Sequence, residues 1–252
     1  MIKAVVIGSG NVAAHLIKAL GSSPQVQLVQ AVARRPEQLE GVLPPEKITH
    51  NFNEITEADV YLISVTDGAI AQVSAQLPFT GRLVVHTSGS TDMEALDAKN
   101  RRGVFYPLQT FSKAKDVDFK AIPLCLEAEN EADFDTLRTL AEALSNSVYS
   151  ISQAQRQALH VAAVFVSNFA NHMYAQGAKV CEEHGIPFAI LQPLIQETAA
   201  KVATLHPLQA QTGPAIRHDE KTIQRHLDFI INKHQKAIYT LLTQSIQDEQ
   251  KL

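Results

Sequence analysis

Residues 2–13 read IKAVVIGSGNVA, and this stretch decides the fold of the first half of the chain. Residues 2–7 are apolar and rich in β-branched side chains, as expected of a strand buried on both faces. Gly8, Gly10 and Ala13 follow in a G-x-G-x-x-A pattern, directly before a segment of helical periodicity. A strand, a glycine-rich turn and a helix in this order predict the start of a dinucleotide-binding Rossmann domain.

Each small residue in this pattern has its own physical role. Gly8 permits the tight turn, Gly10 leaves room for a pyrophosphate, and Ala13 lets the helix pack closely on the strand. The free N–H groups at the start of the helix then face the phosphates. The alternative is a plain strand-to-helix turn. We predict that the cofactor contacts at this turn come from Gly8, Ser9, Gly10, Asn11 and Val12.

The end of the next predicted strand, residues 25–33, indicates which dinucleotide binds. An NAD site places a carboxylate there for the ribose hydroxyls, whereas this chain has Arg34 and Arg35. Guanidinium groups bind phosphate through paired donors. We therefore predict NADP(H) as the cofactor; the alternative is a pair of arginines that only meets solvent.

Strands and helices alternate through the first 152 residues. The apolar runs predict strands over residues 2–7, 25–33, 59–65, 82–86, 104–106, 122–127 and 147–151. Helical periodicity lies between them, over residues 12–20, 67–77 and 131–144, and another helix is predicted to begin at residue 36. This alternation predicts an α/β fold with a doubly wound parallel sheet. Residues 1–152 are thus predicted to form an NADP-binding Rossmann domain.

The pattern changes at residue 153, where strands stop. Helices are predicted over residues 153–183 and 188–205, one or two further helices over residues 220–250, and a loop with two prolines over residues 206–218. Residues 153–252 are therefore predicted to form an all-helical domain for substrate binding and dimerisation.

The carboxyl ends of parallel strands meet at one edge of a sheet, where ligands bind. Val65 and Thr66 end one predicted strand and are expected to contact the cofactor, whereas Asp67 is interpreted as the N-cap of the next helix. His86 ends the following strand and could exchange a proton near neutral pH. Ser88 could bind substrate or the nicotinamide amide. Alternatively, His86 and Ser88 could serve only to cap and fix the strand end.

Further polar candidates lie in a loop and on the first long helix. Gln109 is polar in an apolar setting and could face the site or hold its own loop. His160, Ser167, Asn168 and Asn171 share one stripe of the predicted helix. Such groups find partners in each other, in a neighbouring helix or in a ligand, and we favour the ligand.

Composition and charge exclude several classes of function. The 252 residues carry 22 basic and 26 acidic side chains, a net charge of −4, so no positive excess is available to bind nucleic acid. Cys125 and Cys181 lie far apart and outside any CxxC pattern, which predicts reduced thiols, and the histidines show no metal-binding spacing. The N-terminal apolar run is too short for a signal peptide, and no stretch reaches the length of a membrane span. We expect a soluble, cytoplasmic protein without a metal site.

These motifs resemble known families. Through VVIGSGNVA and Arg34-Arg35, the N-terminal half is similar to the NADP-binding domain of pyrroline-5-carboxylate reductases and deazaflavin-dependent NADP oxidoreductases. The whole chain resembles a bacterial family that pairs a Rossmann-like domain with a helical domain of unknown function, and whose members carry the label of NADP oxidoreductases. The matching segments are HTSGS (86–90), PLQTF (107–111), LHVAAVFVSN (159–168) and TGPAIRHD (212–219).

The resemblance implies a second domain like that of 6-phosphogluconate dehydrogenase, which often forms dimers. The chain departs from the related enzymes at three places. Val164 stands where hydroxy-acid dehydrogenases of that superfamily have a lysine, four residues before Asn168. The segment 212–219 lacks the Gly- and Thr-rich signature of pyrroline-5-carboxylate reductases, and Tyr106 stands where a histidine is expected before the proline.

Together these observations predict an NADP(H)-dependent oxidoreductase that moves a hydride to or from a C=O or C=N carbon of a small polar substrate. His160 or His86 would exchange the proton, and Ser88, Gln109 and Asn168 would orient the substrate. A homodimer through the helical domain is expected. One alternative is a dinucleotide-binding sensor or scaffold without turnover, and another is a helical half that serves chiefly for assembly.

Overall fold

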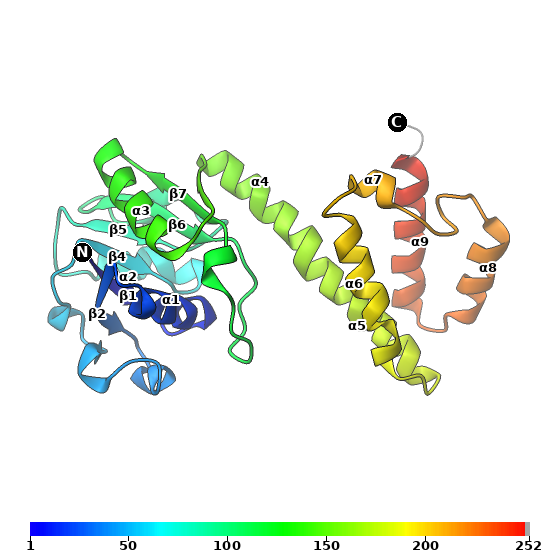
Figure 1. Cartoon of the computed structure of the whole chain (residues 1–252), viewed down its shortest axis with the longest axis horizontal. Coiled ribbons are helices and arrows are strands. Elements are labelled where there is room, and N and C mark those ends of the chain that lie inside the picture. Colours follow the sequence, from blue (N-terminus) through cyan, green and yellow to red (C-terminus); the bar gives the residue numbers. More distant parts are fainter. Residues whose placement is uncertain (250–252) are drawn as a thin grey trace. The chain divides into compact units, whose positions relative to one another are not determined.

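The protein divides into two compact units, Met1–Asn168 and Phe169–Leu252. The computed structural model describes residues 1–249. The first unit holds a sheet with helices around it, and the described part of the second is helical (Figure 1). The predicted α/β domain followed by an all-helical domain is confirmed. The boundary predicted at residue 152 stays a prediction; the two compact units meet further along the chain, at Asn168.

The sheet has eight strands among the described residues, in the order β3-β2-β1-β4-β5-β6-β7-β8. Their bounds are Ile2–Ile7 (β1), Val26–Val32 (β2), Ile48–Thr49 (β3), Val60–Ile63 (β4), Leu83–His86 (β5), Arg101–Pro107 (β6), Leu124–Ala128 (β7) and Val148–Ser150 (β8). All neighbouring strands are parallel except β6 and β7, where the prediction of a parallel sheet is wrong. Residues 108–123 contain no α-helix, but an isolated bridge between Ser112 and Lys115 and a 3₁₀ turn, Phe119–Ala121. Without a crossover helix the chain returns antiparallel.

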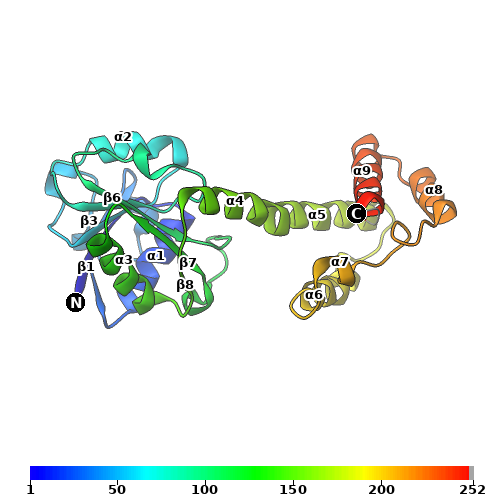
Figure 2. The same ribbon diagram turned by 90° about the horizontal axis from the view of Figure 1, so that it is seen from above.

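Helices cover both faces of the sheet, which makes it doubly wound (Figure 2). Helices α1 (Asn11–Ser22) and α3 (Glu131–Leu144) lie on one face, and α2 (Ile70–Ala75) lies on the other. Alternate residues of β1 supply the two cores: Val6 packs in the cluster of α1 and α3, and Val5 in the cluster of α2. Strand β1 is therefore buried on both faces, as its composition predicts.

Two local predictions in the first unit need correction. The helix expected from residue 36 is a single 3₁₀ turn, Pro36–Leu39, because Gly41, at a φ of +75°, and the prolines that follow stop it. Strand β3 was not expected, since two residues are too few to show a period of two. It pairs with the end of β2 and closes that edge of the sheet.

The long helix predicted over residues 153–183 is interrupted. It begins as α4 (Gln153–Ala163), passes through a π-helical segment, Val164–Phe169, and goes on as α5 (Ala170–Glu183). A π segment has i→i+5 hydrogen bonds, so the spacing of 3.6 residues per turn does not hold across it. The polar stripe predicted from His160 to Asn171 therefore does not continue as one straight line.

The described part of the second unit contains α5, the 3₁₀ turn Phe188–Leu191, α6 (Gln192–Lys201), α7 (Pro207–Ala210), α8 (Glu220–Phe229) and α9 (Lys233–Glu249). The loop predicted over 206–218 thus includes one short helix. The predicted helix over 188–205 is shorter and starts as a 3₁₀ turn, and Gln250, the predicted end of the last helix, lies outside the described residues. Few side chains of this unit are buried: Cys181, Ala215, Ile223 and Gln235.

Candidate active site at the carboxyl edge of the sheet

Four parallel strands end side by side at the carboxyl edge of the sheet. The last residue of β1 pairs with those of β2 and β4, and that of β4 pairs with that of β5. These ends are Ile7, Val32, Ile63 and His86. The segments that follow them therefore converge at one place, as the crevice rule for α/β sheets requires.

The turn after β1 has the geometry of a pyrophosphate site. Gly8 adopts a φ of +142°, and a Cβ at this position would overlap the carbonyl group of Ser64. Its N–H donates to the Val32 carbonyl at 2.8 Å, which ties the turn to the end of β2. A Cβ on Gly10 would meet nothing within 4 Å, so the space beside this residue is open. Gly10 also precedes the first residue of α1, where backbone N–H groups are free for an anion.

The other residues predicted at this turn are held by their neighbours. Ser9 donates to the Gln38 side chain at 2.7 Å, which connects the turn to the segment after β2. Asn11 donates to the Phe111 carbonyl at 3.0 Å, so its side chain supports a distant loop. Val12 packs against the core. The structure thus brings all five predicted residues to the start of α1.

The two arginines after β2 are exposed and unpaired. Arg34 and Arg35 follow Ala33 directly, and neither has an ion-pair partner within residues 1–249. The Ser9–Gln38 bond places the segment that begins with them beside the glycine turn. The residues at this edge therefore fit a dinucleotide whose ribose carries one more phosphate.

Val65 is half-buried and Thr66 exposed at the end of β4, where both can meet a cofactor. The interpretation of Asp67 as an N-cap is wrong. The cap position of the turn that follows is Thr66, and its side chain makes no capping bond. Asp67 instead accepts a hydrogen bond from the Ser90 hydroxyl at 2.6 Å, because the loop after β5 lies next to it.

The loop after β5 is built around His86 and Ser88. The His86 side chain has no exposed area, and its Nδ1 accepts from the Ser88 N–H at 3.2 Å. Burial, and next the positive charge of Arg156, lower the pKa of His86 to about 4, so the imidazole is neutral at pH 7. The Ser88 hydroxyl accepts from the N–H groups of Ser90 and Thr91 at 3.1 and 3.0 Å. Both side chains therefore shape the loop.

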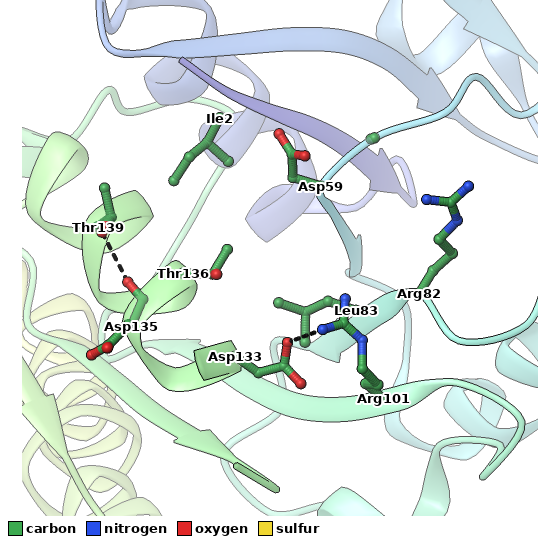
Figure 3. A pocket seen from close by; sticks show the side chains of 10 residues that line it. Ile2, Asp59, Arg82, Leu83, Arg101, Asp133, Asp135, Thr136 and Thr139 are labelled. Carbon is green, nitrogen blue, oxygen red and sulfur yellow. Dashed lines mark hydrogen bonds and ion pairs between the residues drawn. The ribbon is translucent and has the colours of Figure 1, made fainter. Parts of the chain in front are cut away.

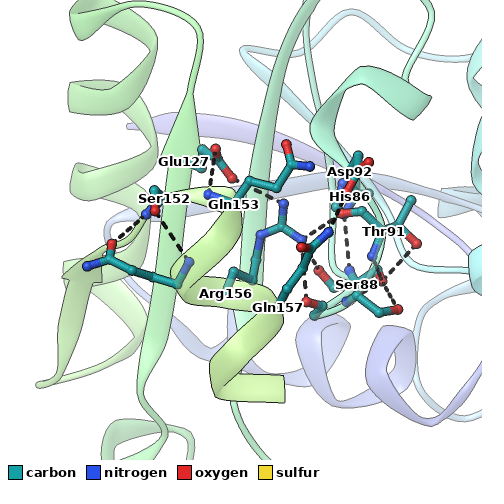
Figure 4. A network of polar contacts seen from close by, with 12 residues as sticks. His86, Ser88, Thr91, Asp92, Glu127, Ser152, Gln153, Arg156 and Gln157 are labelled. Atoms are coloured by element: carbon teal, nitrogen blue, oxygen red, sulfur yellow. Dashed lines mark hydrogen bonds and ion pairs between the residues drawn. The ribbon is translucent and has the colours of Figure 1, made fainter. Parts of the chain in front are cut away.

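A buried arginine that the sequence analysis missed holds the same loop. Arg156 in α4 is fully buried, and its Nη1 donates to the Thr91 carbonyl at 2.6 Å. Longer contacts of 3.4 and 3.5 Å reach the carbonyls of Gly89 and Ser88, and Nη2 binds Glu127 of β7 at 3.1 Å (Figure 4). The available signal was the position of Arg156, one helical turn before His160.

His160 meets Tyr106 beside this loop. The Tyr106 hydroxyl lies 3.3 Å from His160 Nδ1, with the two rings edge to face. Burial, and next the neighbouring Cys125, raise the pKa of Tyr106, which therefore keeps its proton at neutral pH. Tyr106 is the residue that stands where a histidine was expected. Among the described residues at this edge, Tyr106 and His160 form the pair best suited to donate or accept a proton.

Gln109 and Asn168 are not part of this cluster in the described contacts. Gln109 is exposed, and its side chain accepts from the N–H of Thr110 at 2.8 Å, so it holds its own turn. Asn168 is exposed in the π segment. The catalytic roles given to His86, Ser88, Gln109, Asn168 and His160 stay predictions.

The opposite edge of the sheet has a hollow of about 480 Å³ (Figure 3). Its two arginines are paired, Arg101 with Asp133 at 2.6 Å and Arg82 with Glu57. Among residues 1–249, no group of three His, Cys, Asp or Glu side chains could hold a metal ion. In the same part of the chain, none of the helices has the length and apolar character needed to cross a membrane.

Comparison with known proteins agrees with this geometry. The domain of unknown function DUF2520 matches residues 122–246. A Bacteroides fragilis protein, described as a "putative NADP oxidoreductase", is 40% identical, with 98% of each chain covered and a TM-score of 0.88. A Thermotoga maritima protein is 19% identical over 97% of this chain and 98% of its own, with a TM-score of 0.78. No match was found among curated proteins.

More distant structures share the fold alone. An imine reductase variant from Myxococcus stipitatus, in complex with NAD+, is 17% identical over all of this chain and 94% of its own, with a TM-score of 0.60. The fold and the glycine turn define the class, Rossmann-fold proteins with a candidate dinucleotide site. Within it, the chain belongs to the family of the Bacteroides fragilis protein, and its own residues 122–246 match DUF2520.

Proposed function

We propose that the protein is an NADP(H)-dependent oxidoreductase that reduces or oxidises a C=O or C=N carbon of a small polar substrate. The observation that supports it best is the carboxyl edge itself, where an open glycine turn, two unpaired arginines and a Tyr–His pair converge. Gly8 and Gly10 would receive the pyrophosphate, and Arg34 and Arg35 the ribose phosphate. When bound, the cofactor supplies or accepts the hydride.

In this proposal His160, and not His86, exchanges the proton with the substrate. His86 is fully buried and neutral, whereas His160 is half-buried and bonded through one ring nitrogen to Tyr106. In the direction of reduction, His160 would give a proton to the substrate oxygen or nitrogen. Tyr106 would hold the imidazole in place through Nδ1. Val65 and Thr66 would contact the nicotinamide half, next to this pair.

Calorimetric titration with NADPH and NADH tests the cofactor assignment. We expect NADPH to bind about tenfold or more tightly than NADH, because only NADPH has the third phosphate for the arginines. The variant Arg34→Ala/Arg35→Ala should remove this difference and leave NADH binding unchanged. Equal or tighter binding of NADH by the unaltered protein would overturn the assignment.

A substrate screen that follows NADPH absorbance tests for turnover. Cyclic imines, aldehydes and ketones should be tried in one direction, and amines and alcohols with NADP+ in the other. The rival proposal is a dinucleotide-binding sensor or scaffold. It is favoured by the structural use of Ser88 and the local use of Gln109, which leave few free polar groups at the edge. Tight NADPH binding with no turnover would select it.

We also propose that the partner is a second copy of the chain, bound through the helical unit. Large apolar side chains of this unit are exposed although few are buried, as expected of a dimer surface. They include Ile190, Leu194, Leu205, Leu208 and Leu241. Light scattering should give twice the mass of the chain, and Ile190→Glu/Leu194→Glu should lower it to the mass of one chain.

Because Cys125 and Cys181 are free thiols, we assign the protein to the reducing cytoplasm.

A further inference from the structure

Arg156 is the largest fully buried side chain of the described residues, and it is charged. Removing a guanidinium from water costs free energy unless its donors are satisfied. Here Nη1 and Nη2 are bonded, whereas Nε has no partner among the described residues. A leucine or methionine at this place would fill the core at a lower cost, so stability alone does not account for an arginine.

The bonds of Arg156 join three elements that lie far apart in the sequence. Its helix, α4, is one, the loop after β5 is the second, and Glu127 of β7 is the third (Figure 4). Glu127 also accepts from the N–H of Gln153 at 3.1 Å, so one carboxylate holds both the start of α4 and the guanidinium. The planar fork of arginine suits such a junction, because its donors point in fixed directions.

The junction lies directly beside the Tyr–His pair. His160 is four residues after Arg156, on the same face of α4. The loop that Arg156 holds includes Gly89, and a Cβ on Gly89 would lie 2.6 Å from Tyr106 Cζ and 2.7 Å from His160 Nδ1. The loop, the tyrosine and the histidine are therefore in close contact, and a small shift of the loop would separate the two side chains.

We propose that Arg156 is a positioning residue. It fastens the loop of residues 88–91 to α4 and so keeps the Tyr106 hydroxyl within hydrogen-bond distance of His160. Its effect on turnover rests on the proposed function, in which His160 exchanges the proton. The contact between Tyr106 and His160 can be measured without any substrate, so the two ideas can fail separately.

The variant Arg156→Lys tests the proposal. Lysine keeps the charge but has its donors at one point, so it cannot reach the loop and Glu127 together. Arg101→Lys is the matched control, because Arg101 also binds a buried carboxylate, Asp133, but at the amino edge of the sheet. Tyr106→Phe supplies the reference for a lost Tyr–His bond. Circular dichroism establishes that each variant is folded.

Nuclear magnetic resonance gives the readouts. In Arg156→Lys we expect the imidazole ¹⁵N shifts of His160 to move to the values seen in Tyr106→Phe. Amide exchange at residues 88–91 should become about tenfold faster, because the loop opens more often. NADPH binding should stay within about twofold of the unaltered protein, since the glycine turn is untouched. Once a substrate is known, kcat of Arg156→Lys should be about 10–100-fold lower, while its KM for NADPH is unchanged. Arg101→Lys should change none of these.

Unaltered His160 shifts and loop exchange in folded Arg156→Lys would overturn the proposal. If that variant does not fold, Glu127→Gln takes its place, because glutamine keeps an acceptor oxygen for Arg156. The same changes at smaller size would then support the proposal, and unchanged readouts would overturn it. Unfolding of both variants would also overturn it, since the bonds would then serve the whole fold. A screen without turnover would count only against the proposed function.

Discussion

The turn after β1 and the loop after β5 lie at the same edge of the sheet, but local residues determine the conformation of the turn and a distant residue that of the loop. The turn takes its form from its own residues: Gly8 at positive φ, Gly10 beside open space, and the start of α1. The loop of residues 88–91 takes its form from Arg156, which is distant in the sequence. A site can therefore combine a part that local backbone chemistry determines with a part that tertiary contacts determine.

The largest effect is expected at the turn. Gly8→Ala would force a Cβ into the Ser64 carbonyl at a φ of +142°, which few other residues adopt. We expect a loss of about 3 kcal/mol or more in the free energy of unfolding, measured by urea denaturation. Nucleotide binding should be lost with it.

Gly10→Ala is the matched variant, because its Cβ would meet only open space. Its free energy of unfolding should change by less than about 1 kcal/mol, whereas its affinity for NADPH should fall about tenfold or more, since the methyl group occupies the pyrophosphate space. If Gly8→Ala left the free energy of unfolding unchanged and Gly10→Ala lowered it, the two glycines would have the opposite roles.

The next effect belongs to the loop and depends on pH. The pKa of His86 lies at about 4 in the folded protein against 6.5 for a free histidine, and Arg156, Asp67 and Asp92 are the charges around it. Between these two values the unfolded chain takes up a proton that the folded protein excludes, so stability falls as the pH falls. We expect this residue to cost about 3 kcal/mol between pH 7 and pH 4.

His86→Asn separates this effect from that of the carboxylates. An asparagine oxygen can accept from the Ser88 N–H as Nδ1 does, but it does not titrate. Urea denaturation at pH 7, 5.5 and 4 should show a shallower decline in the variant than in the unaltered protein. If the free energy of unfolding fell equally with pH in the variant and in the unaltered protein, burial would not be lowering the pKa of His86.

A smaller effect is expected where the loop meets the Tyr–His pair. Gly89→Ala would place a Cβ 2.6 Å from Tyr106 and 2.7 Å from His160, so one of the side chains must move. We expect a loss of about 1–3 kcal/mol in stability, measured by urea denaturation, with NADPH affinity unchanged. Gly68→Ala is the control, because a Cβ there would meet nothing within 4 Å. A fall in NADPH affinity in Gly89→Ala would show that the loop and the turn are not independent.

The same division explains what the sequence could predict. The glycine turn, the buried β1 and helix α3 follow from local patterns, and α3 has the predicted bounds of Glu131–Leu144. A contact from elsewhere decided one wrong prediction, since Asp67 bonds to Ser90 instead of capping a helix. Others failed for local reasons: Gly41 and the prolines after it stop the helix expected from residue 36, and β7 turns antiparallel because no helix precedes it. The π segment in the long helix leaves no mark on a 3.6-residue pattern.

The site divides likewise. Gly8 and Gly10 could be predicted because backbone geometry requires glycine or favours it. Arg156 could not, because a single arginine in a helical segment looks like a surface residue until the carbonyls it binds are brought beside it. Tyr106 and His160 are far apart in the sequence, and only the fold shows that one reaches the other.

The smallest expected loss of stability tests how much the hydrogen bonds within the loop of residues 88–91 stabilise its conformation. Ser88→Ala removes a hydroxyl that accepts from two backbone N–H groups, which should cost about 1 kcal/mol by urea denaturation. Ser90→Ala is the control and should cost little, because the Asp67 side chain that it binds is exposed. If Arg156 supplies most of the support, the loss in Ser88→Ala stays near this value of about 1 kcal/mol. A larger loss would make the loop as locally determined as the glycine turn, and the contrast between the two would disappear.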